Sequence, residues 1–373
     1  MARHVTHTGV HDHGFNTLST YGNLWRLMAE GRIDADPWEK AFYELAIKAS
    51  GAVQAARWSE AGALGGYIYS FNGPHSLFID TMRTLRVLAL AHQLGHVLGG
   101  ENDRSISLLD RLIKHGLTSA EYLVWYGTGR DVYDVRGRTA HEGIFNVRDG
   151  HFRCPNTQQG YSPFSTWTRG LAWAMLGFTE QLEFLQAIEP AEIQTACGRE
   201  PVAVRAAFRE AAVATSDYYL GHAACADGVC YWDTGAPNLN RLGAYLERPA
   251  DPRNRYEPVD ASAAAIAAQG MIRLGHALGH AGRSYQQAGL TIARTLFDDP
   301  YLSTDAAHQG LLLHSVYHRP NGWDAIPIGA AVPCGQSSMW GDYHLLELAV
   351  LVGRLARDEG LYVTFYGTLT GQP

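Results

Sequence analysis

The chain has 373 residues, of which 46% are hydrophobic and 18% are charged, with a formal net charge of -7 at pH 7. This composition excludes a disordered chain, a collagen-like fibre and a disulfide-stapled miniprotein, because it supplies ample apolar material for a large core and only five cysteines. The chain has neither a basic excess nor a long run of like charges, which argues against a protein that holds nucleic acid or an anionic membrane by charge.

Cysteine usage and the first residues indicate the cellular compartment. The five cysteines show neither a Cys-x-x-Cys pair nor the Cys/His spacing of a zinc site, so we expect reduced thiols. The first residues lack the apolar segment of an export signal, and no segment approaches 18 uninterrupted apolar residues. We therefore expect a cytoplasmic protein without a membrane partner.

Helical periodicity dominates the chain, and strand signals are rare. Apolar residues recur at helical spacing over residues 15–30, 37–57, 78–98, 103–126, 166–187, 203–223, 260–280, 283–297 and 338–357. Helix starts are signalled by Asp36 before Pro37, by Ser165 or Thr166, and by Asp260. Helices joined by long loops predict an α-solenoid or a closed α/α barrel, and periodicity alone does not choose between them.

Nothing in the composition divides the chain. No Pro/Ser-rich linker separates two halves, so we expect a single catalytic domain over residues 1–373. One segment, residues 232–259, is rich in Pro, Asn, Arg and Gly. It predicts a long insertion loop that is able to act as a lid.

Two carboxylates stand out by their surroundings. Asp12 lies in the sequence His-Asp-His-Gly-Phe at residues 11–15, and Asp80 follows the apolar residues 77–79 at the start of another helix. A carboxylate at such a place ordinarily caps a helix or favours its dipole. The apolar neighbours of Asp80 predict a partly buried carboxyl whose pKa is raised toward the range of a general acid. Arg83, one turn later, would lower that pKa by pairing with Asp80, or would instead bind a substrate carboxylate.

Aromatic rings and a guanidinium gather in a second segment. Gln159 precedes it, and Trp167, Arg169 and Trp173 span a predicted junction between a loop and a helix. Two ring faces and a guanidinium there could converge on a ligand that carries a carboxylate. Taken singly, the same residues fit two core tryptophans and a solvated arginine, and His141 fits a structural histidine.

Together, these segments resemble the unsaturated glucuronyl hydrolase family and, more distantly, the unsaturated rhamnogalacturonyl hydrolases. Residues 11–15 are similar to that family's His-Asp-x-Gly-Phe, and residues 79–82 to its Ile-Asp-x-Met segment. The most recognisable signature is Gln-Gly-Tyr at 159–161 followed by Trp-x-Arg-Gly-x-Ala-Trp at 167–173. Further similar segments lie at 141–150, 260–266, 310–314, 317–324 and 340–343, in the family's order, so the resemblance covers residues 11 to about 350.

The resemblance implies an all-α fold, an (α/α)6 barrel of helical hairpins whose pocket lies where the loops gather. The family's longer region before the first motif leaves open whether the first hairpin is complete. The resemblance also implies a glycoside hydrolase that removes a 4,5-unsaturated uronic acid from the non-reducing end of lyase-generated oligosaccharides by hydrating the C4=C5 vinyl ether. Asp80 would protonate C4, Asp12 would hold ring hydroxyls or stabilise developing positive charge, and no metal or other cofactor would be needed.

The same resemblance assigns a set of substrate-binding residues, which are His11, His141, Gln159, Trp167, Arg169 and Trp173. An alternative is a hydrolase of saturated β-glucuronides that uses Asp12 and Asp80 as an acid/base pair. A second alternative is a non-catalytic scaffold that binds sugars containing uronic acid. The expected partner is in each case an oligosaccharide containing uronic acid, and a homo-oligomer is compatible with the sequence.

Overall fold

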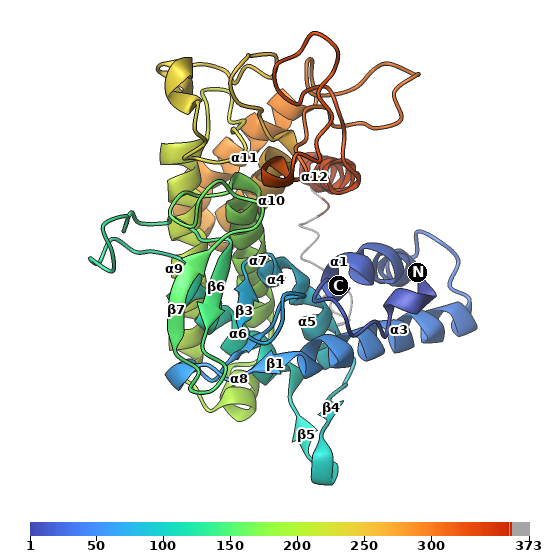
Figure 1. Ribbon diagram of the computed structural model, residues 1–373. Helices are drawn as coiled ribbons and strands as arrows, with labels where there is room; N and C mark the ends of the chain where they lie inside the picture. The colour runs from blue at the N-terminus through green and yellow to red at the C-terminus, as the bar shows by residue number, and fades with distance from the viewer. Residues whose placement is uncertain (358, 360–373) are drawn as a thin grey trace.

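The computed structural model describes residues 1–357 and 359, and these are mainly helical (Figure 1). The helices are α1 (His13–Asn16), α2 (Asn23–Ala29), α3 (Pro37–Ala56), α4 (Thr81–Thr84), α5 (Arg86–Gln93), α6 (Leu108–Leu123), α7 (Thr168–Ala187), α8 (Pro190–Cys197), α9 (Pro201–Tyr218), α10 (Ala261–Ala277), α11 (Arg283–Leu296) and α12 (Met339–Ala356). The strands are β1 (Trp58–Ser59), β2 (Tyr67–Ile68), β3 (Ser76–Phe78), β4 (Leu98–Gly99), β5 (Ser105–Ile106), β6 (Glu142–Phe145) and β7 (Phe152–Asn156).

Inner and outer helices alternate along the chain. Residues 86–91 of α5, 168–185 of α7 and 261–275 of α10 are all buried. By contrast, α3, α6, α9 and α11 each bury only one face. A helix that is buried on every side must be enclosed by other helices, whereas an amphipathic helix covers the outside. The hairpins α5–α6, α7–α9 and α10–α11 therefore each join an inner helix to an outer one, as their mutual contacts show.

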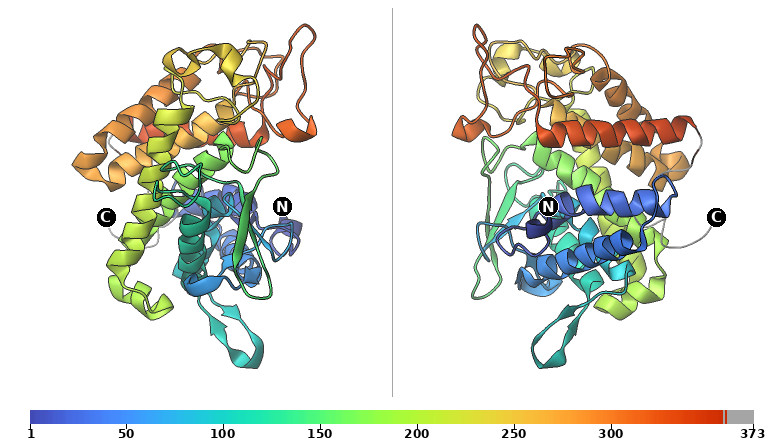
Figure 2. Two further views of the ribbon diagram at one scale, coloured as in Figure 1. Left: turned by 60° about the vertical axis from the view of Figure 1, so that its left-hand side comes forward. Right: turned by 90° about the vertical axis from the view of Figure 1, so that its right-hand side faces the viewer.

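The first hairpin is irregular. Its first arm runs from α1 through a π-helical turn at Leu18–Gly22 into α2, and both helices pack against α3. The last helix, α12, packs against α10 and runs roughly parallel to this first hairpin in the right-hand view of Figure 2. Two contacts join α12 to α2: Tyr343 accepts a hydrogen bond from Asn23 at 3.2 Å, and Arg354 pairs with Glu30 at 2.6 Å.

The predicted helix at 78–98 is wrong at its start. Residues 76–78 form β3, which pairs antiparallel with residues 142–144 of β6, and β6 pairs in turn with β7. The helix begins only at α4, after Asp80. Period-3.6 spacing cannot reveal a strand whose partner lies far along the chain, because the hydrogen bonds that stabilise it are non-local. This pairing is what places Asp80 beside the segment that carries His141, since the Ile79 N–H donates to the His141 carbonyl at 3.0 Å.

Two further structural findings concern the cysteines and the membrane. All five cysteines are free thiols. Among residues 1–357 and 359, no helix is long and apolar enough to cross a membrane.

Candidate active site

A cavity of about 620 Å³ lies between α1, the start of α4, the first turns of α7 and the first turns of α12. Six of the eight predicted site residues line it: Asp12, Asp80, Gln159, Trp167, Arg169 and Trp173. The other two, His11 and His141, stand directly behind the carboxylates, since His11 Nε2 lies 3.5 Å from Asp12 Oδ1 and His141 Nε2 lies 3.7 Å from Asp80 Oδ1. The structure thus brings residues from distant segments into one place.

Neither carboxylate in the cavity caps a helix. Asp12 and Asp80 occupy the N-cap positions of α1 and α4, but neither side chain accepts a capping hydrogen bond. Elsewhere the chain uses aspartate in the ordinary way, because Asp36 accepts hydrogen bonds from two backbone amides of α3, and Asp260 does so for α10. The ordinary structural explanation for Asp12 and Asp80 therefore fails, and both carboxyl groups are available to a ligand.

The environment of Asp80 favours the neutral form of its carboxyl group. The side chain is only 14% exposed, and its Oδ1 is buried without a hydrogen-bond partner. Burial, followed by the negative charge of Asp12, raises the pKa of Asp80 to about 7, against an opposing effect of Arg169. A carboxyl with such a pKa is still about half protonated at neutral pH, so it can act there as a general acid.

His141 is neutral and has a defined tautomer. Burial, and then the positive charge of Arg169, lowers the pKa of His141 to about 3. Its Nδ1 accepts hydrogen bonds from the backbone N–H groups of Gln158 at 3.1 Å and Gln159 at 3.3 Å. The ring proton must therefore be on Nε2, which faces Asp80 Oδ1. At 3.7 Å this contact is too long for a hydrogen bond.

His11 supports the other carboxylate. Its ring is stacked on Phe71 at 5.7 Å and meets the edge of Phe78 at 5.4 Å. Burial lowers the pKa of His11, although the nearby charge of Asp12 opposes this effect. Asp12 itself is 36% exposed and is thus the more solvated of the two carboxylates.

Arg169 is buried in the wall of the cavity, where it bonds to several neighbouring segments. The residue is 3% exposed, so the interpretation as a solvated arginine is wrong. Its Nη1 donates to Asp260 Oδ2 at 2.9 Å and to the carbonyl of Val316, and its Nη2 donates to Gln159 Oε1 at 2.9 Å and to the carbonyl of Tyr317 at 2.7 Å. Because protein acceptors occupy both terminal nitrogens of Arg169, the guanidinium contributes its positive charge to the cavity but no free pair of N–H donors.

The guanidinium also stacks between two tryptophans. Its central carbon lies 4.6 Å from the ring centroid of Trp167 and 5.0 Å from that of Trp340. The Trp340 indole donates to Ser262 Oγ at 3.1 Å, and Ser262 Oγ donates to Asp260 Oδ1 at 2.5 Å. Asp260 therefore caps α10, as predicted, and at the same time fixes both Arg169 and the indole of Trp340.

Sequence reasoning left several aromatic wall residues out of the site. Trp173 meets Phe15 at 4.8 Å and His344 at 5.0 Å between ring centroids, and Tyr317 meets Trp340 at 5.1 Å. These rings line the cavity together with Tyr343. Most of them belong to the segments 11–15, 317–324 and 340–343, whose resemblance to family motifs was the signal that could have identified them.

Both interpretations of Arg83 are wrong. It neither pairs with Asp80 nor faces a substrate, because it is fully buried and pairs with Glu180 and, at 2.6 Å, with Glu347. The physical reason is that α4 directs this side chain into the centre of the helices, where two buried carboxylates from α7 and α12 compensate its charge.

The insertion at residues 232–259 does not form a lid over this cavity. None of its residues lines the cavity, and the segment contains two short 3-10 helices at Leu239–Leu242 and Tyr245–Glu247. Within the part of the chain that the structure describes, no group of three or more His, Cys, Asp or Glu side chains is arranged to hold a metal ion.

Comparison with curated proteins identifies distant relatives. No protein-family model matches the chain. The unsaturated glucuronyl hydrolase of Bacillus sp. (strain GL1) is 26% identical over 225 residues, which cover 59% of this chain and 48% of the relative. The corresponding enzyme of Formosa agariphila is 24% identical over 204 residues, which cover 54% of this chain and 40% of the relative. The match thus spans less than half the length of each of these two relatives. The unsaturated chondroitin disaccharide hydrolase of Streptococcus agalactiae serotype III is 25% identical over 344 residues, which cover 90% of this chain and 68% of the relative.

Solved structures confirm the predicted fold class. An unsaturated glucuronyl hydrolase specific for heparin matches with a TM-score of 0.67 and 21% identity, over 97% of this chain and 78% of the other. The enzyme of Bacillus sp. GL1 matches with a TM-score of 0.65 and 23% identity, over 96% of this chain and 78% of the other. The alternation of inner and outer helices is accordingly that of the (α/α)6-barrel proteins. In sequence the chain is thus distantly similar to unsaturated glucuronyl hydrolases and unsaturated chondroitin disaccharide hydrolases, and it shares the fold of the unsaturated glucuronyl hydrolases.

Proposed function

We propose that this protein is a glycoside hydrolase that removes a 4,5-unsaturated uronic acid from the non-reducing end of lyase-generated oligosaccharides by hydrating the C4=C5 vinyl ether. One observation carries the proposal. The Asp80 carboxyl group, which has a pKa of about 7 and does not cap its helix, lines the same cavity as the more exposed carboxylate of Asp12. Vinyl ether hydration begins with protonation of carbon, which needs an acid that is still protonated at working pH.

Each reacting group has a place in this scheme. Asp80 transfers its proton to C4, and positive charge develops at C5 and the ring oxygen. Water then adds its oxygen to C5 and returns a proton to Asp80, so that the net reaction adds one water molecule. The resulting hemiketal opens and releases the remaining sugar from C1. Asp12, as an anion beside the ring, stabilises the developing positive charge.

Nearby polar groups suit the substrate's carboxylate. Gln159 Oε1 already accepts a hydrogen bond from Arg169, so its amide NH₂ is left as a donor toward a ligand. The positive charge of Arg169 in the cavity wall adds attraction without a direct bond. Trp167 and Trp173 flank these polar groups, and their rings fix a sugar ring while excluding bulk water.

Ligands of related proteins support this substrate class. One structure with a TM-score of 0.65 is an unsaturated glucuronyl hydrolase variant described with dGlcA-Glc-Rha-Glc, and another, with a TM-score of 0.51, is a Streptococcus agalactiae variant complexed with dGlcA-GalNAc6S. Both ligands are acidic oligosaccharides.

The same pair of carboxyl groups also suits a hydrolase of saturated β-glucuronides. A neutral Asp80 next to a more solvated Asp12 is the arrangement that an acid/base pair requires. The two activities differ in their product, because only hydration removes the C4=C5 double bond.

Replacement of Asp80 tests the proposed acid. We expect Asp80→Asn to lower the turnover of a lyase-generated unsaturated glucuronyl disaccharide by about 10²–10⁴-fold, the range typical of a lost general acid. Binding of that disaccharide, measured by calorimetry, should change little, because the substitution preserves shape. Asp36→Asn is the matched control, since Asp36 is an exposed helix cap that does not line the cavity and asparagine caps equally well. Unchanged turnover in Asp80→Asn would contradict the assignment.

A further inference from the structure

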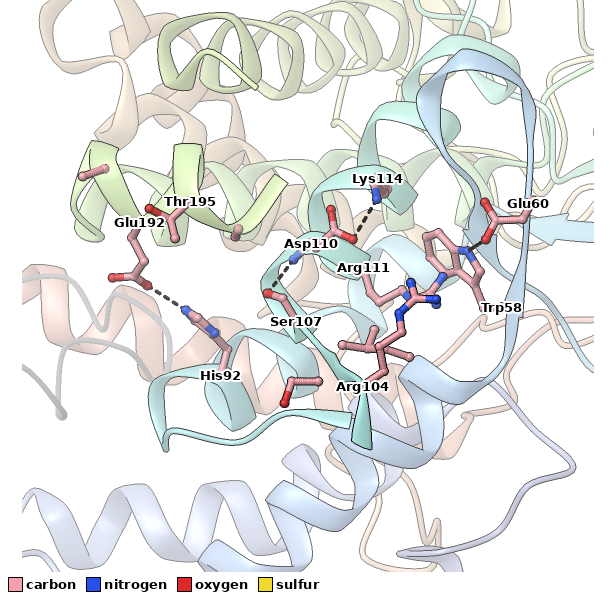
Figure 3. Close-up of a pocket in the computed structure, with 14 residues that line it drawn as sticks. Trp58, Glu60, His92, Arg104, Ser107, Asp110, Arg111, Lys114, Glu192 and Thr195 are labelled. Atoms are coloured by element: carbon pink, nitrogen blue, oxygen red, sulfur yellow. Dashed lines mark hydrogen bonds and ion pairs between the residues drawn. The ribbon is translucent and has the colours of Figure 1, made fainter. Parts of the chain in front are cut away.

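Two other cavities of the protein differ sharply in charge. The larger, of about 710 Å³, lies among α6, α8 and the β4–β5 hairpin that projects from the body of the molecule (Figures 1 and 3). Its acidic and basic side chains are largely paired: Lys114 with Asp110 at 2.8 Å, and His92 with Glu192 at 2.7 Å (Figure 3). This cavity therefore presents no excess of either charge to a ligand.

The other cavity, of about 680 Å³, is strongly basic. It is built wholly from residues between 231 and 256 and is lined by Arg241, Arg248, Arg253 and Arg255. Asp251 is the one carboxylate that lines it. None of the four arginines forms an ion pair within the described residues, and all four are exposed. Guanidinium groups without an ion-pair partner around one cavity attract an anion locally, although the net charge of the protein is -7.

Tyrosines complete the walls. The rings of Tyr231 and Tyr245 meet edge to face at 5.5 Å between centroids, and the guanidinium of Arg241 lies over the ring of Tyr256 at 5.8 Å. Ring faces and phenolic hydroxyls suit sugars, which present both C–H faces and hydroxyl groups. The volume also lies within the range of ordinary ligand sites.

The loop that forms this cavity is held in shape by buried polar side chains. Asn254 donates to the carbonyls of Asp251 at 2.6 Å and Glu257 at 2.7 Å. Glu257 in turn accepts from the Trp232 indole at 2.8 Å and from the backbone N–H of Asn238 at 2.9 Å. A cavity braced in this way needs little ordering when a ligand binds, which favours affinity.

We propose that this arginine-lined cavity is a second carbohydrate site, which binds acidic oligosaccharides that carry carboxylate or sulfate groups. The arginines bind the anionic groups, as guanidinium suits the planar carboxylate and the sulfate oxygens, and the tyrosines contact the sugar rings. The choice of sugar, rather than another anion, rests on the proposed function.

The second site is connected to the active site but is separate from it. Thr168 donates through its hydroxyl to the Tyr231 carbonyl at 2.8 Å and through its N–H to the Trp232 carbonyl at 3.1 Å, and Trp167 forms a β-bridge with Asp233. The segment that bears Tyr231 therefore runs directly beside the wall of the active site. The two cavities share no lining residue, so each can be altered alone.

The test is binding of a saturated chondroitin sulfate hexasaccharide to the whole protein, measured by calorimetry at two salt concentrations. The test variant is Arg253→Ser/Arg255→Ser, because neither side chain makes a hydrogen bond or an ion pair within the described residues. The matched control is Arg104→Ser/Arg148→Ser, which removes two exposed arginines elsewhere. Maltohexaose serves as the neutral sugar and inorganic sulfate as the bare anion.

We expect the test variant to weaken hexasaccharide binding about tenfold or more and to reduce its salt dependence, whereas the control changes it less than about twofold. Turnover of the unsaturated disaccharide should be the same in both variants as in the unaltered protein. Equal hexasaccharide binding by test and control variants would overturn the proposal, as would equally tight binding of maltohexaose or of sulfate alone. If the unaltered protein shows no disaccharide turnover but the arginine variant loses the hexasaccharide, the second site stands and the proposed function fails.

Discussion

The buried carboxyl group of Asp80 imposes a cost in stability that depends on pH. Its pKa is raised from 3.8 to about 7 in the folded protein, by burial and then by the charge of Asp12. The unfolded chain releases this proton near pH 4, so between about pH 4 and pH 7 the unfolded state binds fewer protons and the free energy of unfolding falls as pH rises. At about 1.4 kcal/mol per pH unit, the cost is absent below pH 4 and reaches about 4 kcal/mol above pH 7. Asp80→Asn should remove it.

Urea unfolding of the unaltered protein and of Asp80→Asn, at pH 5 and pH 8, measures this cost. We expect the variant to be more stable by about 1.7 kcal/mol at pH 5 and by up to about 4 kcal/mol at pH 8. Asp36→Asn should change the unfolding free energy little at either pH, since Asp36 is exposed and asparagine is an equivalent cap. A gain that is the same at both pH values, or a loss at pH 8, would refute the raised pKa.

Three further predictions concern the same site. The kcat/KM for the unsaturated disaccharide should fall about tenfold per pH unit above about pH 7, because Asp80 then loses the proton that it must donate, and a profile flat to pH 9 would contradict this. Arg169→Ala should lower the free energy of unfolding by about 3–5 kcal/mol, because it leaves the buried Asp260 unpaired, so a fall below about 1 kcal/mol in urea unfolding would show that the pair is not structural. Trp340→Ala should raise KM more than it lowers kcat, because Trp340 lines the cavity. Trp38→Ala, at a 74% exposed position outside the cavity, should change neither constant. Equal kinetics of the two variants would show that Trp340 is not part of the site.

Local sequence proved informative where a property depends on near neighbours. The apolar residues 77–79 predict a partly buried Asp80 carboxyl with a raised pKa; its side chain is 14% exposed, and burial raises its pKa to about 7. The predicted N-caps Asp36 and Asp260 are likewise confirmed, because a capping carboxylate and the backbone N–H groups that donate to it lie within three residues of each other. Spacing alone could not show that the side chains of Asp12 and Asp80 make no capping hydrogen bond, because this depends on the side-chain conformations in the folded protein.

Properties that depend on distant partners could not be predicted. Arg83 lies one turn from Asp80 in sequence, yet it pairs with Glu180 and Glu347, which come from other helices. Arg169 acquires its structural role only through Asp260, far along the chain. Such pairs form when inner helices meet, and a single sequence records no sign of which helices will be neighbours.

We propose that the protein hydrates a C4=C5 double bond in the cavity lined by Asp12 and Asp80, and that it does not hydrolyse a saturated glycoside there. The most direct test offers the purified protein a lyase-generated unsaturated uronyl disaccharide and, separately, a saturated aryl β-glucuronide. The first reaction is followed by loss of the ultraviolet absorbance of the conjugated double bond, and the second by release of the aryl group. The account predicts loss of absorbance without aryl release. Aryl release with the double bond left intact would contradict it and would favour the two-carboxylate glycosidase instead.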